Sequence, residues 1–227
     1  MQYIQKSGPQ PGDWDLWFTT GTGNRSYNYN SDASAMRNLP LAKKHLLEEQ
    51  NWLCAYCQQK LTLEQASIEH VIPKEFNKEQ STNYHNLVAV CKETPTDPID
   101  DRVHCDKYKQ SEMIASLIFS SASDVTQQSN HRFLEANSDG SISAKGKGSI
   151  EDKKLAEVFI EVLNLNHSLL KAKRAVDHLN PLISIATNFN RNDRRKFWKL
   201  QFSNISRDKE RPFRMFLLIY IGRILGF

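Results

Sequence analysis

All four cysteines of this chain lie in one stretch of the sequence, between residues 54 and 105. Cys54 and Cys57 form a CxxC pair, and two intervening residues let both sulfurs reach one side of a tight turn. Cys91 and Cys105 complete a set of four thiolates, which is the number that a structural zinc ion binds. The sequence therefore predicts that this stretch folds around a structural Zn²⁺.

The second half of the cysteine set is spaced more loosely than the first. Thirteen residues separate Cys91 from Cys105, so the segment between them must loop out. Two alternatives stay open on the sequence alone. Cys91 and Cys105 could be buried thiols that bind no metal, or His104 could replace one cysteine as a ligand.

Composition restricts the class of protein. The 227 residues include 39% hydrophobic and 25% charged residues, which is ordinary for a globular protein and argues against wholesale disorder. The net charge of +4 permits a nucleic-acid partner without requiring one. The longest apolar run, residues 215–221, is too short to span a bilayer, and the first residues have no apolar signal core. We expect a cytoplasmic protein with reduced cysteines and no membrane contact.

Three segments follow from the pattern of residues along the chain: an N-terminal arm with a lead-in helix (1–50), a cysteine-rich core (51–112) and a mostly helical C-terminal region (113–227). Pro40 at a first helical position predicts a helix over 40–52. A strand is expected over 67–72, a second extended segment over 86–91 and a helix from about Asp106. The Asp139-Gly140 pair predicts a hairpin, and helical periodicity predicts helices over 150–165 and 167–179.

Inside the cysteine frame lie the groups that a phosphodiesterase needs. His70 can take a proton from water, and the adjacent Glu69 offers a hard oxygen to a divalent ion. Neighbouring side chains of a strand point to opposite faces, so both can reach one site only if the strand curves or ends there. Asn86 is a short amide able to brace a loop. Asp106 follows a zinc cysteine directly and could equally be a helix cap.

Four motifs follow one another along this segment: the CxxC pair, Glu-His-x-x-Pro, Asn-Leu before a cysteine, and Cys-Asp-x-x-Lys. In this order they resemble the HNH endonucleases of the ββα-metal fold. The resemblance covers residues 52–110 and implies an α+β protein with a zinc-stapled ββα-metal core in a mostly α-helical chain. It implies that His70 is the general base and that Glu69 and Asp106 bind a catalytic Mg²⁺ or Mn²⁺. Asn86 would brace the site. Family members often carry Asn or His in place of Asp106 and a tighter second cysteine pair.

The flanks, residues 40–180, are similar to the HNH nuclease subunit of the Septu antiphage systems, which in some loci accompanies a retron. This likeness implies three kinds of partner: a nucleic-acid substrate, an ABC- or SMC-like ATPase, and in retron loci a reverse transcriptase with its RNA–DNA hybrid. DNA is the favoured substrate, and RNA such as tRNA is the alternative.

Basic residues outside the core offer candidate nucleic-acid contacts. They are Lys107, Lys109, Arg194, Arg195 and Lys196. Aromatic residues interleave the cluster after Arg191, which suits nucleic-acid stacking, although an amphipathic helix with the aromatics in its core has the same pattern. The apolar segment 213–227 is expected to be a buried terminal helix, with a docking helix for a partner as the alternative.

Three functions are compatible with this sequence. The first is a metal-dependent endonuclease that acts in a defence complex with an ATPase. The second is a standalone HNH endonuclease of restriction or homing type, which would need a recognition module of its own. The third is a non-catalytic zinc module that binds nucleic acid or protein.

Overall fold

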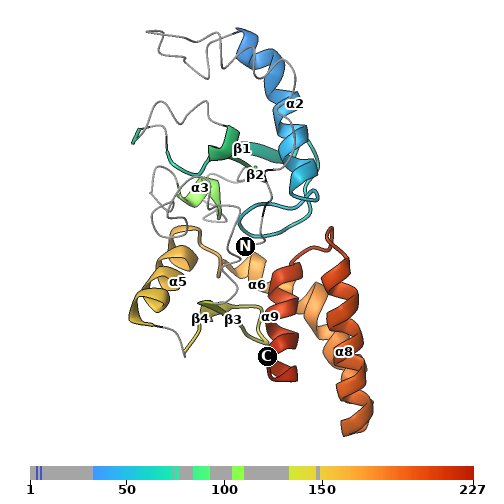
Figure 1. Ribbon diagram of the computed structural model, residues 1–227. Helices are drawn as coiled ribbons and strands as arrows, with labels where there is room; N and C mark the ends of the chain where they lie inside the picture. Colours follow the sequence, from blue (N-terminus) through green and yellow to red (C-terminus); the bar gives the residue numbers. More distant parts are fainter. Residues whose placement is uncertain are drawn as a thin grey trace.

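The computed structural model describes residues 4, 6, 33–73, 75–76, 84–92, 104–109, 133–146 and 149–227, with the backbone alone for residues 33–39, 85, 106 and 107. It contains two small antiparallel sheets and a set of helices (Figure 1). The expected α+β class is confirmed. No helix in the described part of the chain is long and apolar enough to cross a membrane.

The cysteine-rich core is a strand hairpin followed by a short helix (Figure 1). Strand β1 (Ala66–His70) pairs antiparallel with β2 (Leu87–Cys91), which follows the 3₁₀ turn η2 (Tyr84–Asn86). Helix α3 (Asp106–Lys109) completes a ββα arrangement. The register pairs Ala66 with Cys91 and His70 with Leu87, so the hairpin has a cysteine at one end and the Glu-His pair at the other.

A hairpin and a helical array form the C-terminal region. The hairpin consists of β3 (Leu134–Ala136) and β4 (Ile142–Ala144). The helices are α5 (Ile150–Val162), α6 (Ser168–Ala172), the π-helical stretch η5 (Lys173–Leu179), α7 (Asn180–Thr187), α8 (Arg191–Arg207) and α9 (Arg214–Leu225). Helices α8 and α9 pack side by side (Figure 1).

The lead-in helix is longer than the sequence predicts. Helix α2 runs from Ala33 to Glu49, so Pro40 lies inside it and not at its first position. Proline removes one helical hydrogen bond and crowds the preceding turn. The residues that follow it compensate, because Ala42, Leu46 and Leu47 are fully buried and fix the helix against the core. A proline therefore does not mark the start of this helix.

One hydrophobic cluster joins all three segments of the chain. It includes Ile4 of the N-terminal arm, Leu87 of β2, Leu163 after α5 and Leu217 and Ile221 of α9. Helix α9 is the buried terminal helix that its apolar sequence predicts. The C-terminal region therefore completes the core of the cysteine-rich segment.

The aromatic residues of α8 are packing residues. Trp198 is buried, Phe197 contacts Phe189 and Trp198, and Phe202 contacts Phe227 at a ring separation of 5.4 Å. Trp198 is closed to solvent, and the half-buried rings of Phe197 and Phe202 pack on other rings. This packing favours the amphipathic-helix interpretation of the segment.

The Asp139-Gly140 hairpin is present where the sequence predicts it. Asp139 Oδ1 accepts hydrogen bonds from the Ser141 amide and hydroxyl, and Gly140 has a φ of +83°. A Cβ at Gly140 would lie 2.0 Å from the carbonyl oxygen of Lys171 in α6. Both the left-handed conformation and the close approach of the helix backbone require glycine here.

We expect Gly140→Ala to lower the free energy of unfolding by about 2 kcal/mol or more, since it combines a positive φ with an overlap against backbone. Gly146→Ala is the matched control, because nothing lies within 4 Å of a Cβ at that position. Denaturant unfolding followed by circular dichroism measures both. Equal stability of the two variants would contradict the packing described here.

Candidate metal centre and active site

The first two cysteines lie in a tight loop closed by backbone hydrogen bonds. The Cys54 amide donates to the Gln59 carbonyl, and the Gln58 amide donates to the Cys54 carbonyl. Gln58 takes a positive φ of 65°, which turns the chain back after Cys57. The loop therefore directs both sulfurs of the CxxC pair to the same side.

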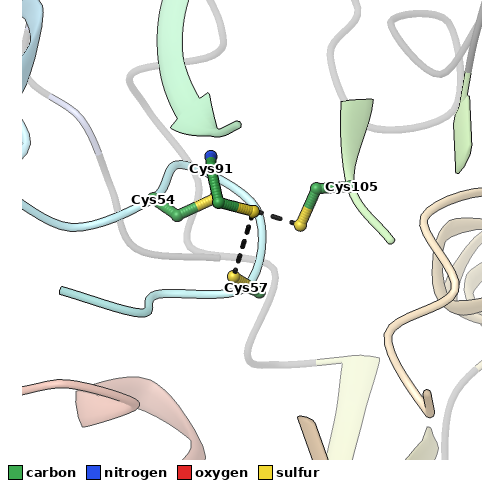
Figure 2. Close-up of side chains that lie close together, drawn as sticks. All are labelled: Cys54, Cys57, Cys91 and Cys105. Carbon is green, nitrogen blue, oxygen red and sulfur yellow. Dashed lines mark hydrogen bonds between the residues drawn. The ribbon is translucent and has the colours of Figure 1, made fainter. Parts of the chain in front are cut away.

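The other two cysteines reach the same point from separate elements (Figure 2). Cys91 is the last residue of β2, and Cys105 directly precedes α3. The Cys54 sulfur lies 3.8 Å from that of Cys91 and 3.9 Å from that of Cys105, and the Cys57 and Cys91 sulfurs are 3.9 Å apart. A tetrahedral zinc ion with Zn–S bonds of about 2.3 Å separates its sulfurs by about 3.8 Å. The spacing of the sulfurs fits that geometry.

Burial makes the cluster a poor place for thiolates without a cation. All four cysteines are buried. Burial raises the pKa of the Cys105 thiol well above its usual value, and the neighbouring sulfurs of Cys54, Cys57 and Cys91 add to the rise. Burial also opposes ionisation of Cys54, but hydrogen bonds from Cys105, Cys57 and Cys91 outweigh it and lower the pKa of Cys54. The pKa of Cys57 is lowered as well, despite burial, through its hydrogen bond with Cys105, whereas that of Cys91 is raised. The thiols of Cys91 and Cys105 therefore have to lose protons when a divalent ion binds, and the affinity for the ion falls with falling pH.

His104 lies against the sulfurs but outside the four-ligand set. The four cysteine sulfurs all lie within 4.8 Å of one another and make up the tetrahedral set by themselves. His104 Nδ1 is 3.1 Å from the Cys105 sulfur and 3.6 Å from that of Cys91. A metal-bound thiolate carries no proton, so Nδ1 must donate in these contacts. His104 therefore orients and stabilises the thiolates.

Arg174 supplies a buried positive charge near the cluster. Its side chain donates to the carbonyl oxygens of Leu165 (2.7 Å) and Gly140 (3.2 Å). Burial lowers its pKa to about 10, against the opposing field of Cys57 and Cys105. The guanidinium stays charged at neutral pH and offsets the negative charge that four thiolates keep after binding a divalent ion.

The Glu-His pair lies at the opposite end of the β1–β2 hairpin, about 13 Å along the strand from the cysteine end at 3.3 Å per residue. Strand β1 ends at His70, two residues earlier than predicted. Asn86 turns the chain there: its Oδ1 accepts from the Ile72 amide (2.7 Å), and its Nδ2 donates to the Ile72 carbonyl (3.0 Å). The Asn86 carbonyl also accepts from the Val71 amide. These bonds fix the backbone that carries His70.

Two residues that neighbour the cysteine cluster in the sequence contact Glu69. Tyr56, between the CxxC cysteines, donates its hydroxyl to Glu69 Oε1 at 3.3 Å. Lys109, one turn after Cys105, places its ammonium 2.6 Å from the same oxygen. Glu69, His70 and Lys109 are all buried. The two halves of the cysteine cluster are thereby connected to the Glu-His end of the hairpin.

Not every residue predicted for this site is described. The side chains of Asp106 and Lys107 lie outside the described part of the chain. Helix α3 begins at Asp106 and ends at Lys109. The metal-binding role expected for Asp106 therefore stays a prediction.

Comparison with known proteins identifies the segment that carries this geometry. Residues 54–93 match the HNH endonuclease family. This segment of the chain is similar to an HNH endonuclease domain. The match supports a nuclease that acts on nucleic acid, and it spans three of the four cysteines together with Glu69, His70 and Asn86. No curated protein matches the chain.

The basic residues proposed as nucleic-acid contacts differ in their surroundings. Lys109 is 1% exposed, and its ammonium is bound to a carboxylate of the HNH domain. Arg194 donates to the carbonyls of Ala186 and Phe189 and so caps the end of α7. Lys196 pairs with Asp193 at the surface. Arg195 is exposed, and among the residues of this set whose side chains the structure describes its surroundings best suit a phosphate contact.

Sequence reasoning missed Tyr56 and Arg174, and it assigned Lys109 to the surface. The position of Tyr56 between two zinc-type cysteines was a usable signal, because an aromatic ring there must pack beside the cluster. Arg174 and Lys109 gave no such signal. Each is a basic residue on a helix, and only the packing of distant elements buries it.

We expect the purified protein to bind one zinc ion. Cys91→Ser should lose the ion and unfold, because a tetrahedral site with three thiolates is incomplete.

His104→Ala should keep the ion but bind it about 10- to 100-fold more weakly, because it removes a group that orients the ligands. Elemental analysis and competition with a chromophoric chelator measure both. His178→Ala, outside the site, is the control. Complete zinc loss from His104→Ala would instead make His104 a ligand.

Proposed function

We propose that this protein is a metal-dependent endonuclease that hydrolyses nucleic-acid phosphodiester bonds. DNA is the favoured substrate, and RNA such as tRNA is the alternative. One observation carries the proposal. Glu69 and His70 lie together at the end of β1, on a backbone held by Asn86, inside the HNH domain.

In this proposal His70 is the general base. An imidazole can accept a proton from water at neutral pH, and a positioned base of this kind contributes about 10²- to 10⁴-fold to a hydrolysis rate. Asn86 is the positioning residue, because its two hydrogen bonds to Ile72 hold the turn that begins directly after His70. Displacement of that turn would move the imidazole relative to the phosphate.

Glu69 and Asp106 would hold the catalytic Mg²⁺ or Mn²⁺. Carboxylate oxygens are the donors that these hard ions prefer, and Glu69 presents one at the end of β1. When bound, such an ion polarises the scissile phosphate and neutralises charge on the leaving oxygen. The zinc cluster would take no part in bond cleavage. Its role is to hold the hairpin, the CxxC loop and α3 in register.

We further propose that the nuclease is the effector subunit of a bacterial antiphage defence complex of the Septu type, with an ABC- or SMC-like ATPase as its partner. In retron loci a reverse transcriptase and its RNA–DNA hybrid would join them. The likeness of residues 40–180 to the Septu nuclease subunit supports this role. Co-purification with an ATPase encoded beside the gene tests it, and full cleavage without any ATPase would favour a standalone restriction- or homing-type enzyme.

A non-catalytic zinc module is the competing function, and one observation favours it. The buried Lys109–Glu69 ion pair is a contact that a purely structural hairpin could use to hold α3. The endonuclease and the module differ in their need for His70, because a structural hairpin does not require a base at the end of β1.

We expect His70→Ala to lower the rate of metal-dependent cleavage about 100-fold or more, since it removes the base. The assay uses the purified chain with Mg²⁺ or Mn²⁺ on plasmid DNA, single-stranded DNA and total RNA, with and without the ATPase. His178→Ala, on η5, is the control and should cut like wild type. Cleavage that persists unchanged in His70→Ala would disprove the catalytic assignment.

Asn86→Ala has a control in the same chain. Asn166 makes the same pair of hydrogen bonds to the backbone of Ile142 that Asn86 makes to Ile72. The two Asn166 bonds are each 2.8 Å long. Each variant loses two hydrogen bonds, and Asn86→Ala should cost about 2–4 kcal/mol of stability because its partners are shielded from water. At a temperature where both variants stay folded, cleavage should fall in Asn86→Ala and not in Asn166→Ala. An equal loss in both would show that Asn86 acts through stability alone.

A further inference from the structure

The Lys109–Glu69 ion pair has an unusual location for a lysine. Its side chain is 1% exposed, its ammonium lies 2.6 Å from Glu69 Oε1, and the carbonyl oxygen of His70 is 3.5 Å away. Helix α3 is only four residues long and is held at its start by Cys105, whose carbonyl accepts from the Lys109 amide. The position of Cys105 in the cysteine cluster therefore helps to place the Lys109 ammonium against the Glu69 carboxylate.

The carboxylate in question is the proposed ligand of the catalytic ion. A divalent ion and an ammonium both bind carboxylate oxygen through charge, and both would approach Glu69 at the end of β1. Two cations that share one buried carboxylate repel each other strongly, because little water screens them. A divalent ion on either oxygen of Glu69 would lie beside the ammonium, so the observed ion pair and a bound metal ion oppose each other.

We propose that Lys109 occupies the cation position of the active site at rest and competes with the catalytic divalent ion for Glu69. Metal binding then requires the Lys109 side chain to leave the carboxylate. The free protein is held in a metal-poor, restrained state, and anything that displaces the lysine raises the metal affinity of the site. This inference rests on the proposed function, because it takes Glu69 as a metal ligand.

Calorimetric titration of the zinc-loaded full chain with Mn²⁺ tests the competition without any cleavage assay. Lys109→Met should bind Mn²⁺ about 10- to 100-fold more tightly than wild type, the range that corresponds to removal of one competing charged hydrogen bond. Lys60→Met is the matched control: its ammonium is also 2.6 Å from a carboxylate, that of Glu210, but both side chains are exposed. It should bind Mn²⁺ like wild type. Equal or weaker binding by Lys109→Met overturns the proposal.

A measurement on the wild-type chain covers the case in which Lys109→Met fails to fold, since that variant leaves Glu69 buried without its cation. Amine-reactive labelling with mass spectrometry should find Lys109 protected without Mn²⁺ and modified as Mn²⁺ saturates the site. Lys60 should be modified equally at every concentration. A Lys109 that stays protected at saturating Mn²⁺ contradicts the proposed displacement.

The same titrations separate this inference from the proposed function. Glu69→Gln combined with Lys109→Met should lose the gain in Mn²⁺ affinity, because the shared carboxylate is gone. Equal Mn²⁺ binding by wild type and Lys109→Met, together with wild-type cleavage, rejects the competition and leaves the nuclease standing. No Mn²⁺ binding by wild type, Lys109→Met or Lys60→Met overturns both the competition and the metal role of Glu69.

Discussion

Convergence of four cysteine sulfurs is the constraint on which the rest of the structure depends. The sulfurs come from the CxxC loop, the end of β2 and the residue before α3, and they meet at the spacing of a tetrahedral zinc ion. In the described part of the chain the β1–β2 sheet has two strands, and a hairpin of that size is marginally stable by itself in water. A metal ion bound by the sulfurs of these three elements would provide the missing stabilisation and would fix α3 relative to the hairpin.

The same cluster determines the surroundings of the proposed active site. Tyr56 lies between Cys54 and Cys57, and Lys109 lies one turn after Cys105, yet both end at Glu69 Oε1. Loss of a zinc ion from this cluster would therefore destabilise the fold, and it would also release two of the groups that hold the Glu69 carboxylate. On the other side of the Glu-His pair, Asn86 fixes the backbone, because its hydrogen bonds to Ile72 hold the turn after His70. The β1–β2 hairpin thus separates the candidate zinc site at one end from the proposed chemistry at the other.

The C-terminal region takes part in this arrangement. The Phe213 and Met215 amides donate to Gln58 in the CxxC loop, and Cys105 donates its amide to Leu163 after α5. Arg174 places its charge near the thiolates while it ties the β3–β4 hairpin to the helices. Much of what the sequence offers there for nucleic-acid binding is used inside the fold. The α8 aromatics pack on other rings, and Arg194 caps α7.

The sequence by itself determined the features whose partners are near in the chain or whose residue types have few uses. The CxxC loop, the end of the strand at the Glu-His pair, the loop-bracing amide and the Asp-Gly hairpin all follow from local chemistry, and four cysteines in one window leave little besides a metal site. Tertiary structure alone decided the burial of Lys109 and Arg174, the packing of the α8 aromatics and the extension of α2 through Pro40. Each of these depends on contacts between elements that are distant along the chain, and a basic or aromatic residue on a helix has the same local pattern whether solvent or a neighbouring element covers it.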